Sequence, residues 1–295
     1  MAVFYRRLPQ FKYIAAETVD DALSCLVEYR QKARLLAGGT DLIPQFKQRE
    51  IPIPEYVIDI KGIAGLEAIT YDPESGLKIG ALATMASIEK SPVLQKHFPI
   101  LVQAASSMAS PQIRNRGTFA GNICAAVPSA DSAPALLAMG AKVVLQAMTG
   151  FRMVSLEKFF TGPRATVMCE DEMLVYIFVP KPESETRGIY LKLSPRHSMD
   201  LAIVGIAAAG RCEDGICTHI RIALGAVAPT PIRATGAEQV LRGQKVTPEV
   251  IDQAARSAVD HCSPRIDSHR ASPEYRRDMV YVLTKRALKQ VLEIG

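Results

Sequence analysis

The stretch Ser110-Pro-Gln-Ile-Arg-Asn-Arg-Gly-Thr-Phe-Ala-Gly-Asn-Ile-Cys124 interrupts the hydrophobic pattern of this chain. Its apolar residues recur neither every three to four positions, as in an amphipathic helix, nor at every second position, as in a half-buried strand. We therefore predict a loop. Its centre, Thr118–Asn122, offers a hydroxyl, small residues and an amide side chain to a ligand. The same segment is equally typical of a loop that binds nothing.

A similar break occurs at Leu35-Leu-Ala-Gly-Gly-Thr-Asp-Leu42, where a short apolar strand is predicted to end at two glycines. Glycine lets a backbone approach a phosphate without a Cβ in the way. The helix predicted to follow would present N–H groups of its first turn, which have no acceptor within the helix. Taken alone, this segment also fits a plain turn. Together, the two breaks predict loops that grip the two phosphates of one dinucleotide.

Two charged residues stand near these segments. Asp131 begins a predicted helix, so its carboxylate suits a ribose hydroxyl or the helix N-terminus, and the two roles are compatible. Lys192 lies between apolar residues of a predicted strand. A lysine there is either exposed on an edge strand or buried beside a partner, because burying a lone charge is costly. In the second case it would place a cation near an electron-rich ring or an anionic cofactor.

Composition excludes several classes of function. The chain is 48% hydrophobic and 22% charged, as in ordinary globular proteins, and its net charge of +5 comes without a basic block, which argues against nucleic acid binding. No apolar run is long enough for a membrane span, and the start has no signal-peptide pattern, so we expect a cytoplasmic protein. Six dispersed cysteines predict reduced thiols, with no metal or iron–sulfur cluster in this chain. The Rossmann fingerprint, the P-loop and the common hydrolase motifs are missing, and no catalytic side chain stands out.

Length and element order predict two domains of α+β class. We place the boundary in the polar segment 181–187, which gives an N-terminal domain at residues 1–180 and a C-terminal domain at 186–295. A capping box at Thr18 marks the first helix. The predicted elements are helices at 19–31, 131–139, 234–241, 248–261 and 273–293, a short helix after Leu42, one or two helices within 87–108, and strands at 34–37, 56–60, 77–81, 142–146, 173–179, 190–193, 201–211 and 220–227.

The order of six motifs resembles the FAD-binding medium subunit of the molybdenum hydroxylases, most of all that of bacterial xanthine dehydrogenases. Each motif is loose, whereas their shared order and spacing over essentially the whole chain are specific. The motifs are AGGTDL (37–42), PQIRNRGTFAGNIC (111–124), PSADSAPALLAMGAKV (128–143), KLSPRHSMDLAIVGIAA (192–208), LGAVAPTPIRA (224–234) and RASPEYRRDMVYVLTKRAL (270–288).

The resemblance implies a vanillyl-alcohol-oxidase-type (PCMH) FAD-binding domain, followed by a smaller CO dehydrogenase flavoprotein C-terminal domain. It implies that two segments wrap the FAD diphosphate, that Asp131 lies on the ribose side, that Leu174 is an apolar cofactor contact, and that Lys192 lies on a strand facing the flavin. The implied cofactor-binding residues are Leu35, Leu36, Ala37, Gly38, Gly39, Thr40, Asp41, Leu42, Thr118, Phe119, Ala120, Gly121, Asn122, Asp131, Leu174 and Lys192.

The implied function is electron transfer within a multi-subunit enzyme. Electrons would come from the 2Fe-2S clusters of a small partner subunit, a large subunit would hold molybdopterin, and NAD+ or another acceptor would be reduced. Alternatives of the same class are FAD subunits of carbon monoxide, nicotinate or aromatic-CoA enzymes. Alternatives of other classes are a flavin-free assembly or binding protein and a stand-alone flavin oxidase.

Three positions qualify the resemblance. Ala120 stands where the family usually has glycine, and its methyl group fits if the backbone φ is negative there. Met108 stands where the animal enzymes carry an aromatic residue beside the flavin, so we do not assign it that role. The aromatic-CoA branch of the family carries a cysteine-rich insertion soon after the position of Asn122. In this chain only Cys124 lies there, without neighbouring cysteines, which argues against that branch.

Overall fold

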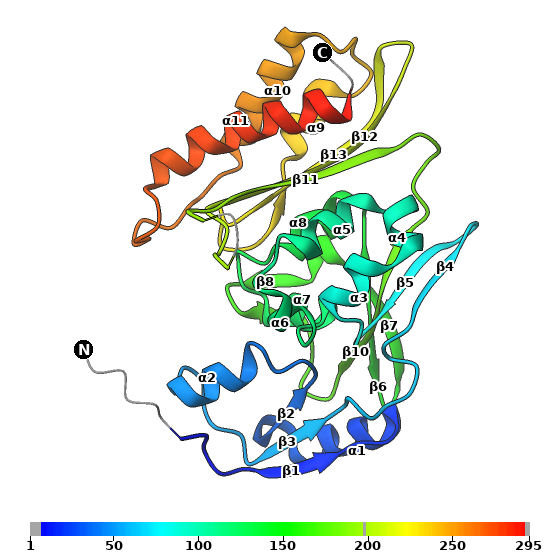
Figure 1. Ribbon diagram of the computed structural model, residues 1–295, viewed down its shortest axis with the longest axis vertical. Helices are drawn as coiled ribbons and strands as arrows, with labels where there is room; N and C mark the ends of the chain where they lie inside the picture. The colour runs from blue at the N-terminus through cyan, green and yellow to red at the C-terminus, as the bar shows by residue number, and fades with distance from the viewer. Residues whose placement is uncertain (1–6, 197–198, 293–295) are drawn as a thin grey trace.

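The computed structural model describes residues 7–196 and 199–292, and it is built from three bodies stacked along its long axis (Figure 1). The first body, in blue at the bottom, is a parallel sheet in the order β1-β3-β2. Two helices accompany it, and the predicted capping box is present, since Asp21 N–H donates to Thr18 Oγ1 at 3.1 Å and Thr18 N–H to Asp21 Oδ2 at 2.9 Å. Its elements are β1 (Lys12–Ala15), α1 (Val19–Tyr29), β2 (Ala33–Leu36), α2 (Leu42–Gln48) and β3 (Tyr56–Asp59).

The second body is an antiparallel sheet in the order β4-β5-β10-β6-β7, covered on one face by short helices. The sheet consists of β4 (Ile69–Asp72), β5 (Gly76–Gly80), β6 (Lys142–Ala147), β7 (Gly150–Ser155) and β10 (Met173–Pro180). The helices are α3 (Met85–Lys90), α4 (Pro92–His97), α5 (Pro99–Ser106), α6 (Pro111–Arg114), α7 (Phe119–Ala125) and α8 (Ser132–Ala138), and a small hairpin is formed by β8 (Phe160–Gly162) and β9 (Ala165–Thr166).

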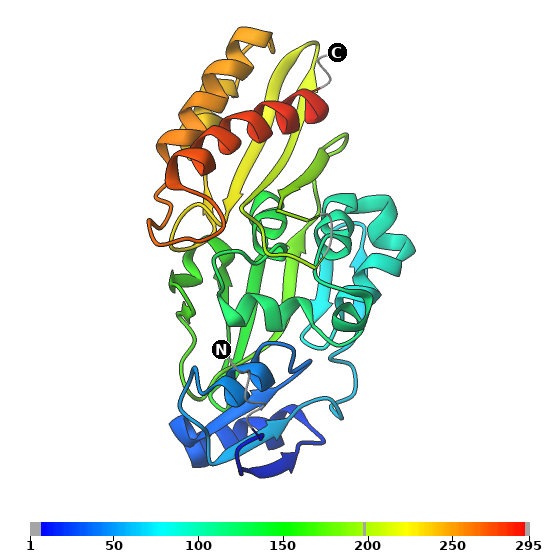
Figure 2. The same cartoon turned by 60° about the vertical axis from the view of Figure 1, so that its left-hand side comes forward.

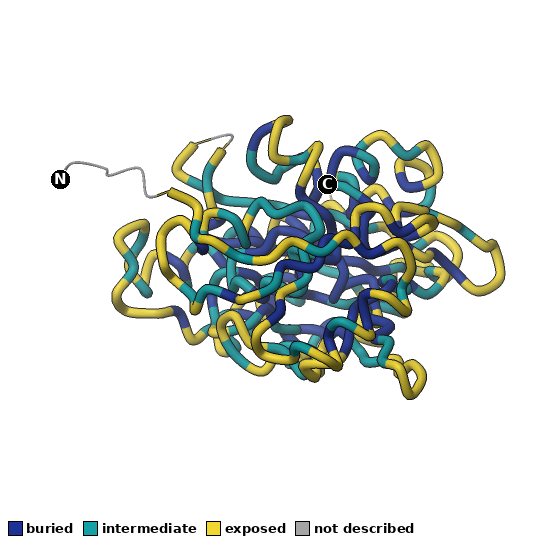
Figure 3. The backbone as a smooth tube through the Cα atoms, turned by 90° about the horizontal axis from the view of Figure 1, so that it is seen from below, coloured by how far each residue is buried: buried dark blue, intermediate teal, exposed yellow. Residues whose placement is uncertain are grey.

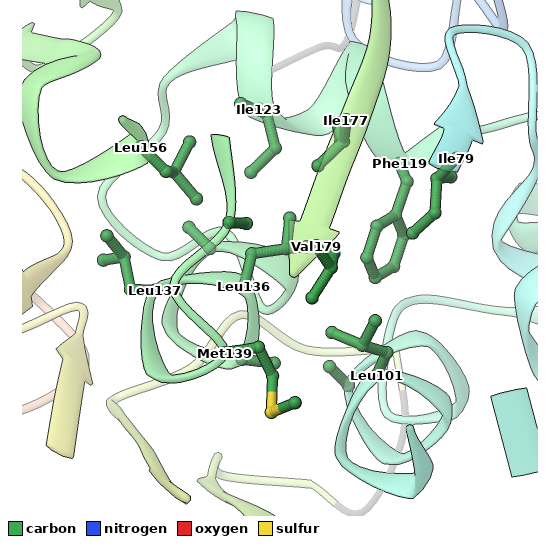
Figure 4. Close-up of a cluster of buried hydrophobic side chains, with 14 of the residues drawn as sticks. Ile79, Leu101, Phe119, Ile123, Leu136, Leu137, Met139, Leu156, Ile177 and Val179 are labelled. Atoms are coloured by element: carbon green, nitrogen blue, oxygen red, sulfur yellow. The ribbon is translucent and has the colours of Figure 1, made fainter. Parts of the chain in front are cut away.

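The central strand β10 carries a different core on each face. A β-bulge between Leu174 and Tyr176 shifts the alternation, so Leu174 shares a face with Ile177 and Val179. That face packs on α5, α7 and α8, as the buried side chains of Figure 4 show. The opposite face, with Val175, packs on α1 and closes a separate core. The bulge therefore directs Leu174 toward the helices rather than toward α1.

The third body is an antiparallel sheet with long helices on its outer face (Figure 2). Small residues on its inner face, including Ala207 and Ala223, let it approach α8 closely. At Gly225, a Cβ atom would lie 2.7 Å from the Pro134 ring, so this contact leaves no room for a larger residue. The elements are β11 (Arg187–Leu193), β12 (Val204–Glu213), β13 (Ile216–Gly225), β14 (Ile232–Arg233), α9 (Thr235–Leu241), α10 (Pro248–Asp260) and α11 (Pro273–Val291).

Burial follows this arrangement, with buried residues inside and exposed ones on the outer turns (Figure 3). Helix α8 is buried along its whole length because sheets lie on both sides of it. Among the helices of the described residues, none is long and apolar enough to cross a bilayer.

The α+β class and the order of the larger elements agree with the sequence-based predictions, but two local predictions were wrong and several short strands were not predicted. The stretch 110–124 is not a loop, because α6 and α7 occupy much of it. Residues 87–108 hold most of three helices rather than one or two, since prolines start α4 and α5 afresh. The sequence analysis did not predict the strands β1, β4, β7, β8, β9 and β14. The last predicted helix is α11, and its predicted final residue, Glu293, lies outside the described residues.

Candidate functional site

A cavity of about 1180 Å³ lies where the three bodies meet. It brings together most of the residues that the resemblance implied. Those lining it are Leu35, Ala37, Gly38, Gly39, Thr40, Asp41, Leu42, Thr118, Ala120, Gly121, Asn122, Asp131 and Leu174. Leu36, Phe119 and Lys192 do not line it. Phe119 is fully buried in the core, and Lys192 lies behind Asp131.

The segment 38–42 is tightly packed at Gly38, which meets the backbone of a distant part of the chain. A Cβ atom on Gly38 would lie 2.1 Å from the carbonyl oxygen of Arg116, a contact that no side chain can make. Gly39 has a φ of +75°, and its carbonyl accepts from Ile43 N–H at 3.0 Å. The glycine at 38 therefore permits close contact with the residues directly before the second predicted ligand-binding segment, a reason that the sequence alone did not show.

The segment 118–122 is the first turn of α7. Thr118 caps the helix by accepting from Gly121 N–H at 2.9 Å, and a Cβ atom on Gly121 would come 2.7 Å from the same hydroxyl oxygen. Asn122 Oδ1 accepts from the buried Ser132 hydroxyl at 2.6 Å, which fixes the amide at the cavity wall. Ala120 is helical and does not have a positive φ, so its methyl group is accommodated.

Arg164 lines the same cavity from the turn between β8 and β9, and the sequence did not single it out. Its N–H donates to the Ala126 carbonyl at 2.8 Å, and its guanidinium lies 3.3 Å from Glu50. Burial raises the pKa of the Asp41 carboxyl, while the charge of Arg164 lowers it. The available signal was an arginine placed directly after the Gly162-Pro163 turn.

The carboxylate of Asp131 is held from behind by two residues of β11. Tyr190 donates its hydroxyl to Asp131 Oδ1 at 2.6 Å, and the Lys192 ammonium lies 2.8 Å from Asp131 Oδ2. Lys192 also donates to the carbonyl of Ser107 at 3.1 Å. The side chains of Lys192 and Asp131 are only 9% and 5% exposed, so the lysine is buried with a partner. We call Tyr190, Asp131 and Lys192 the wall cluster.

The electrostatics of the wall cluster are dominated by burial. Burial raises the pKa of Asp131, while Lys192 and the Tyr190 hydroxyl lower it. Burial, together with the neighbouring Asp131 charge, raises the pKa of Tyr190 well above its ordinary value, so the phenol stays protonated and remains a donor. The sequence pointed to Asp131 and Lys192 but missed Tyr190, although its position two residues before Lys192 puts both side chains on one face of the strand.

The remaining lining combines apolar side chains with a loop of the third body. Leu174 and Met108 are among the apolar lining residues. Arg196 and Asp200 line the cavity from the loop after β11 and form an ion pair of 3.1 Å. Residues 197 and 198 of this loop lie outside the described residues. The cavity thus has walls from all three bodies.

Comparison with known proteins assigns the family. Residues 9–182 match the family model of the FAD binding domain in molybdopterin dehydrogenase, and residues 189–291 match the CO dehydrogenase flavoprotein C-terminal domain. The chain belongs to the FAD-binding subunits of the molybdopterin dehydrogenases. It is therefore a subunit of an oxidoreductase, and FAD is the cofactor of its family, as the sequence-based resemblance implied.

Members of this family with different activities are similarly close to the chain. It is 35% identical over 281 residues to the xanthine dehydrogenase FAD-binding subunit of Escherichia coli O157:H7, covering 95% of each chain. It is 37% identical over 280 residues to the carbon monoxide dehydrogenase medium chain of Hydrogenophaga pseudoflava, covering 95% and 96%. A solved structure of carbon monoxide dehydrogenase from that organism matches with a TM-score of 0.94 and 36% identity, covering 97% and 99%.

The lining residues of this FAD-binding subunit fit the cofactor. The cavity exceeds the range of about 300–1,000 Å³ that is usual for small-molecule pockets, so it has room for an extended dinucleotide. Its walls offer hydroxyls, an amide and loop backbone for phosphates, a carboxylate for sugar hydroxyls, and apolar side chains for rings. This donor set matches the chemistry of FAD.

Proposed function

We propose that this chain is the FAD-carrying electron-transfer subunit of a multi-subunit molybdenum hydroxylase similar to xanthine dehydrogenase. It would take electrons from the 2Fe-2S clusters of a small partner subunit and deliver them to NAD+ or another acceptor. A large partner subunit would hold molybdopterin and hydroxylate the substrate. The observation that carries the proposal is the cavity itself, in which thirteen of the sixteen implied cofactor-binding residues meet.

Each wall of the cavity has a separate task in this proposal. Residues 38–42 and 118–122 would hold the diphosphate, because Gly38 packs against the backbone of Arg116 and Gly117, directly before Thr118, and so brings the two segments close together. Asp131 would accept hydrogen bonds from sugar-side hydroxyls, and Leu174 would contact a ring. Lys192 would act through Asp131 rather than by direct contact, since its ammonium is engaged by that carboxylate and by Ser107.

FAD, when bound, supplies the exchange of one or two electrons between clusters and acceptor. The residues of this chain bind it, orient it and shield it from water. No side chain of the cavity needs to act as a general acid or base for that task. The chain therefore has no proposed catalytic residue, and its effect on the reaction comes through placement and electrostatics.

The hydroxylated substrate remains open within this proposal, because the substrate pocket would lie in the large subunit. Relatives named for xanthine and for carbon monoxide are almost equally similar to the chain. Nicotinate and aromatic-CoA enzymes stay as alternatives of the same class. We also propose a cytoplasmic location, in keeping with the free thiols of the six cysteines.

The test is purification of the native complex followed by analysis of its cofactors and its anaerobic reduction. We expect about one FAD per copy of this chain, a large chain with molybdopterin and a small chain with iron–sulfur clusters. Xanthine should bleach the flavin absorbance, and NAD+ should restore it. A colourless chain that releases no FAD would support the flavin-free assembly or binding protein instead. Bleaching by carbon monoxide or nicotinate, but not by xanthine, would reassign the substrate.

A further inference from the structure

Tyr190 belongs to the third body yet holds a residue of the cavity wall. Its hydroxyl is 2.6 Å from Asp131 Oδ1, and its side chain is 6% exposed within the core that joins the second and third bodies. Tyr190 does not line the cavity, whereas Asp131 does. Any influence of Tyr190 on a ligand must therefore pass through the carboxylate.

The two oxygens of Asp131 have different partners from the same strand. Oδ1 accepts from Tyr190 and Oδ2 from Lys192, so the plane of the carboxylate is fixed on both sides. Each carboxylate oxygen can accept a second hydrogen bond, and these remaining positions are available to a ligand in the cavity. Two donors on one rigid strand thus orient the carboxylate before a ligand arrives, which lowers the cost of binding.

The neighbouring strand makes room for this arrangement. Gly205 of β12 is paired with Lys192 of β11. A Cβ atom on Gly205 would lie 2.9 Å from the Tyr190 hydroxyl oxygen. Because Gly205 does not have a positive φ, its glycine is needed for space rather than for backbone conformation. An added methyl group would therefore push on the hydroxyl that reaches Asp131.

We propose that Tyr190 is a positioning residue of the cofactor site, whose hydroxyl fixes the Asp131 carboxylate as an oriented acceptor for a sugar-side hydroxyl of FAD. This inference rests on the proposed function, because it takes FAD as the ligand of the cavity. Tyr190 of the third body would thus help to form the cofactor site by holding Asp131, without contacting the cofactor itself. The affinity for FAD would then depend on whether Asp131 is ionised.

The groups that face Asp131 define its pH dependence. In the part of the chain that the structure describes, β11 contributes Tyr190 and Lys192, and the turn after α5 contributes the neutral Ser107 carbonyl through Lys192. The desolvation that raises the pKa of Asp131 is opposed by the Tyr190 hydroxyl. Removing that hydroxyl should raise the pKa further, so the carboxylate would ionise only at higher pH.

The experiment measures the FAD dissociation constant of the full-length chain, stripped of cofactor, across a range of pH. Tyr190→Phe should weaken FAD binding by about tenfold near neutral pH, since a hydrogen bond to a charged group is lost. The pH at which tight binding is reached should also rise by about one unit. A purely structural role would lower stability without moving that pH.

The chain offers a matched control in Tyr13, whose hydroxyl donates to Asp59 Oδ2 at the same distance of 2.6 Å but away from the cavity. Tyr13→Phe should leave FAD affinity and its pH profile unchanged. Gly205→Ala keeps the tyrosine and displaces its hydroxyl, so it should reproduce the weaker binding and the shifted profile. This variant keeps the test decisive if Tyr190→Phe does not fold.

Two negative outcomes are distinguishable. If wild-type chain binds FAD and both Tyr190→Phe and Gly205→Ala bind it with an unchanged pH profile, Tyr190 has no positioning role and the proposed function survives. If wild-type chain itself binds no FAD, the proposed function fails and this inference fails with it.

Discussion

Two clusters with the same three residue types lie in different regions of this molecule. The wall cluster joins the second and third bodies, while Tyr13, Asp59 and Lys61, here called the sheet cluster, lie on the first sheet. In both, a tyrosine hydroxyl lies 2.6 Å from the aspartate, and a lysine lies 2.6 to 2.8 Å from it. Yet the pKa of Asp59 is lowered and that of Asp131 is raised.

The difference comes from access to water. Burial raises the pKa of both carboxyls, but the hydrogen bonds from Lys61 and Tyr13 outweigh it at Asp59. Tyr13 is 59% exposed and the Lys61 side chain 34%, whereas Tyr190 and Lys192 are almost completely buried. The side chains of Asp59 and Asp131 are both buried, at 9% and 5% exposed, so equal contacts have unequal consequences because water reaches the partners of Asp59 but not those of Asp131. In the proposed function, the wall cluster would hold a ligand-binding carboxylate in place at a cost in stability.

The largest expected contrast follows from removing each lysine. Lys192→Met keeps the apolar stem but leaves the Asp131 charge buried beside a single donor, so we expect a loss of about 3 kcal/mol in the free energy of unfolding. Lys61→Met should lose less than about 1 kcal/mol, because water reaches that pair. Urea denaturation of the cofactor-free chain measures both. Equal losses in the two variants would show that burial does not separate the clusters.

The next contrast concerns FAD affinity. Asp131→Asn keeps the size of the side chain but replaces one acceptor oxygen with a donor group, so FAD binding should weaken by about 2 kcal/mol, or roughly 30-fold. Asp59→Asn should leave the affinity unchanged, since Asp59 does not line the cavity. Titration with FAD, followed by flavin fluorescence, gives both constants. An unchanged affinity in Asp131→Asn would remove Asp131 from the cofactor site.

A smaller contrast lies in the pH dependence of stability. The pKa of Asp59 is lowered from 3.8, so its contribution is present above that pH and is lost as the pH falls through the lowered pKa. The pKa of Asp131 is raised from 3.8, so the folded state keeps its proton longer than the unfolded state, and stability is lost as the pH rises through the raised pKa.

Difference curves against the asparagine variants isolate these contributions. The difference in free energy of unfolding between wild type and Asp131→Asn should fall as the pH rises above 3.8. The corresponding difference between wild type and Asp59→Asn should instead rise as the pH increases toward 3.8. Urea denaturation at a series of pH values provides the curves. Slopes of the same sign would contradict the opposite pKa shifts.

The smallest effect is expected at Tyr13. Its hydrogen bond to Asp59 is partly buried, but the Tyr13 side chain is 59% exposed, so Tyr13→Phe should produce only a small shift in the thermal midpoint, because water can take the place of the lost donor. Differential scanning calorimetry of the cofactor-free chain checks this. A clear loss of stability would mean that the sheet cluster is less accessible to water than its exposure indicates.

The sequence predicted much of the fold because its longer elements carry strong local signals. The capping box at Thr18 and the apolar faces of the C-terminal helices gave α1, α10 and α11 close to their observed ends. Strand β10 was visible as a continuous apolar run. Helix α6 was missed because four residues are too few to show a helical period, and α7 was missed because its small and polar residues do not show one. Their caps, Ser110 and Thr118, were the remaining signal.

The candidate site was predicted by family resemblance more than by physical pattern. Motif order led to Gly38, Asn122 and Asp131, which the structure brings to one cavity. The sequence could not show why each position needs its particular residue. Gly38 is required by the Arg116 carbonyl, which lies 78 positions away in the chain. Tyr190 acquires its role only when β11 docks beside α8, a long-range contact that no local pattern encodes.

The central claim, that this cavity holds FAD with Asp131 as an oriented acceptor, is tested most directly by a crystal structure of the chain with FAD. We expect the diphosphate between residues 38–42 and 118–122. We also expect an Asp131 oxygen within about 3.2 Å of a sugar-side hydroxyl, with the Tyr190 hydroxyl still bonded to Asp131. FAD outside this cavity, or an Asp131 carboxylate turned away from it, would contradict the claim.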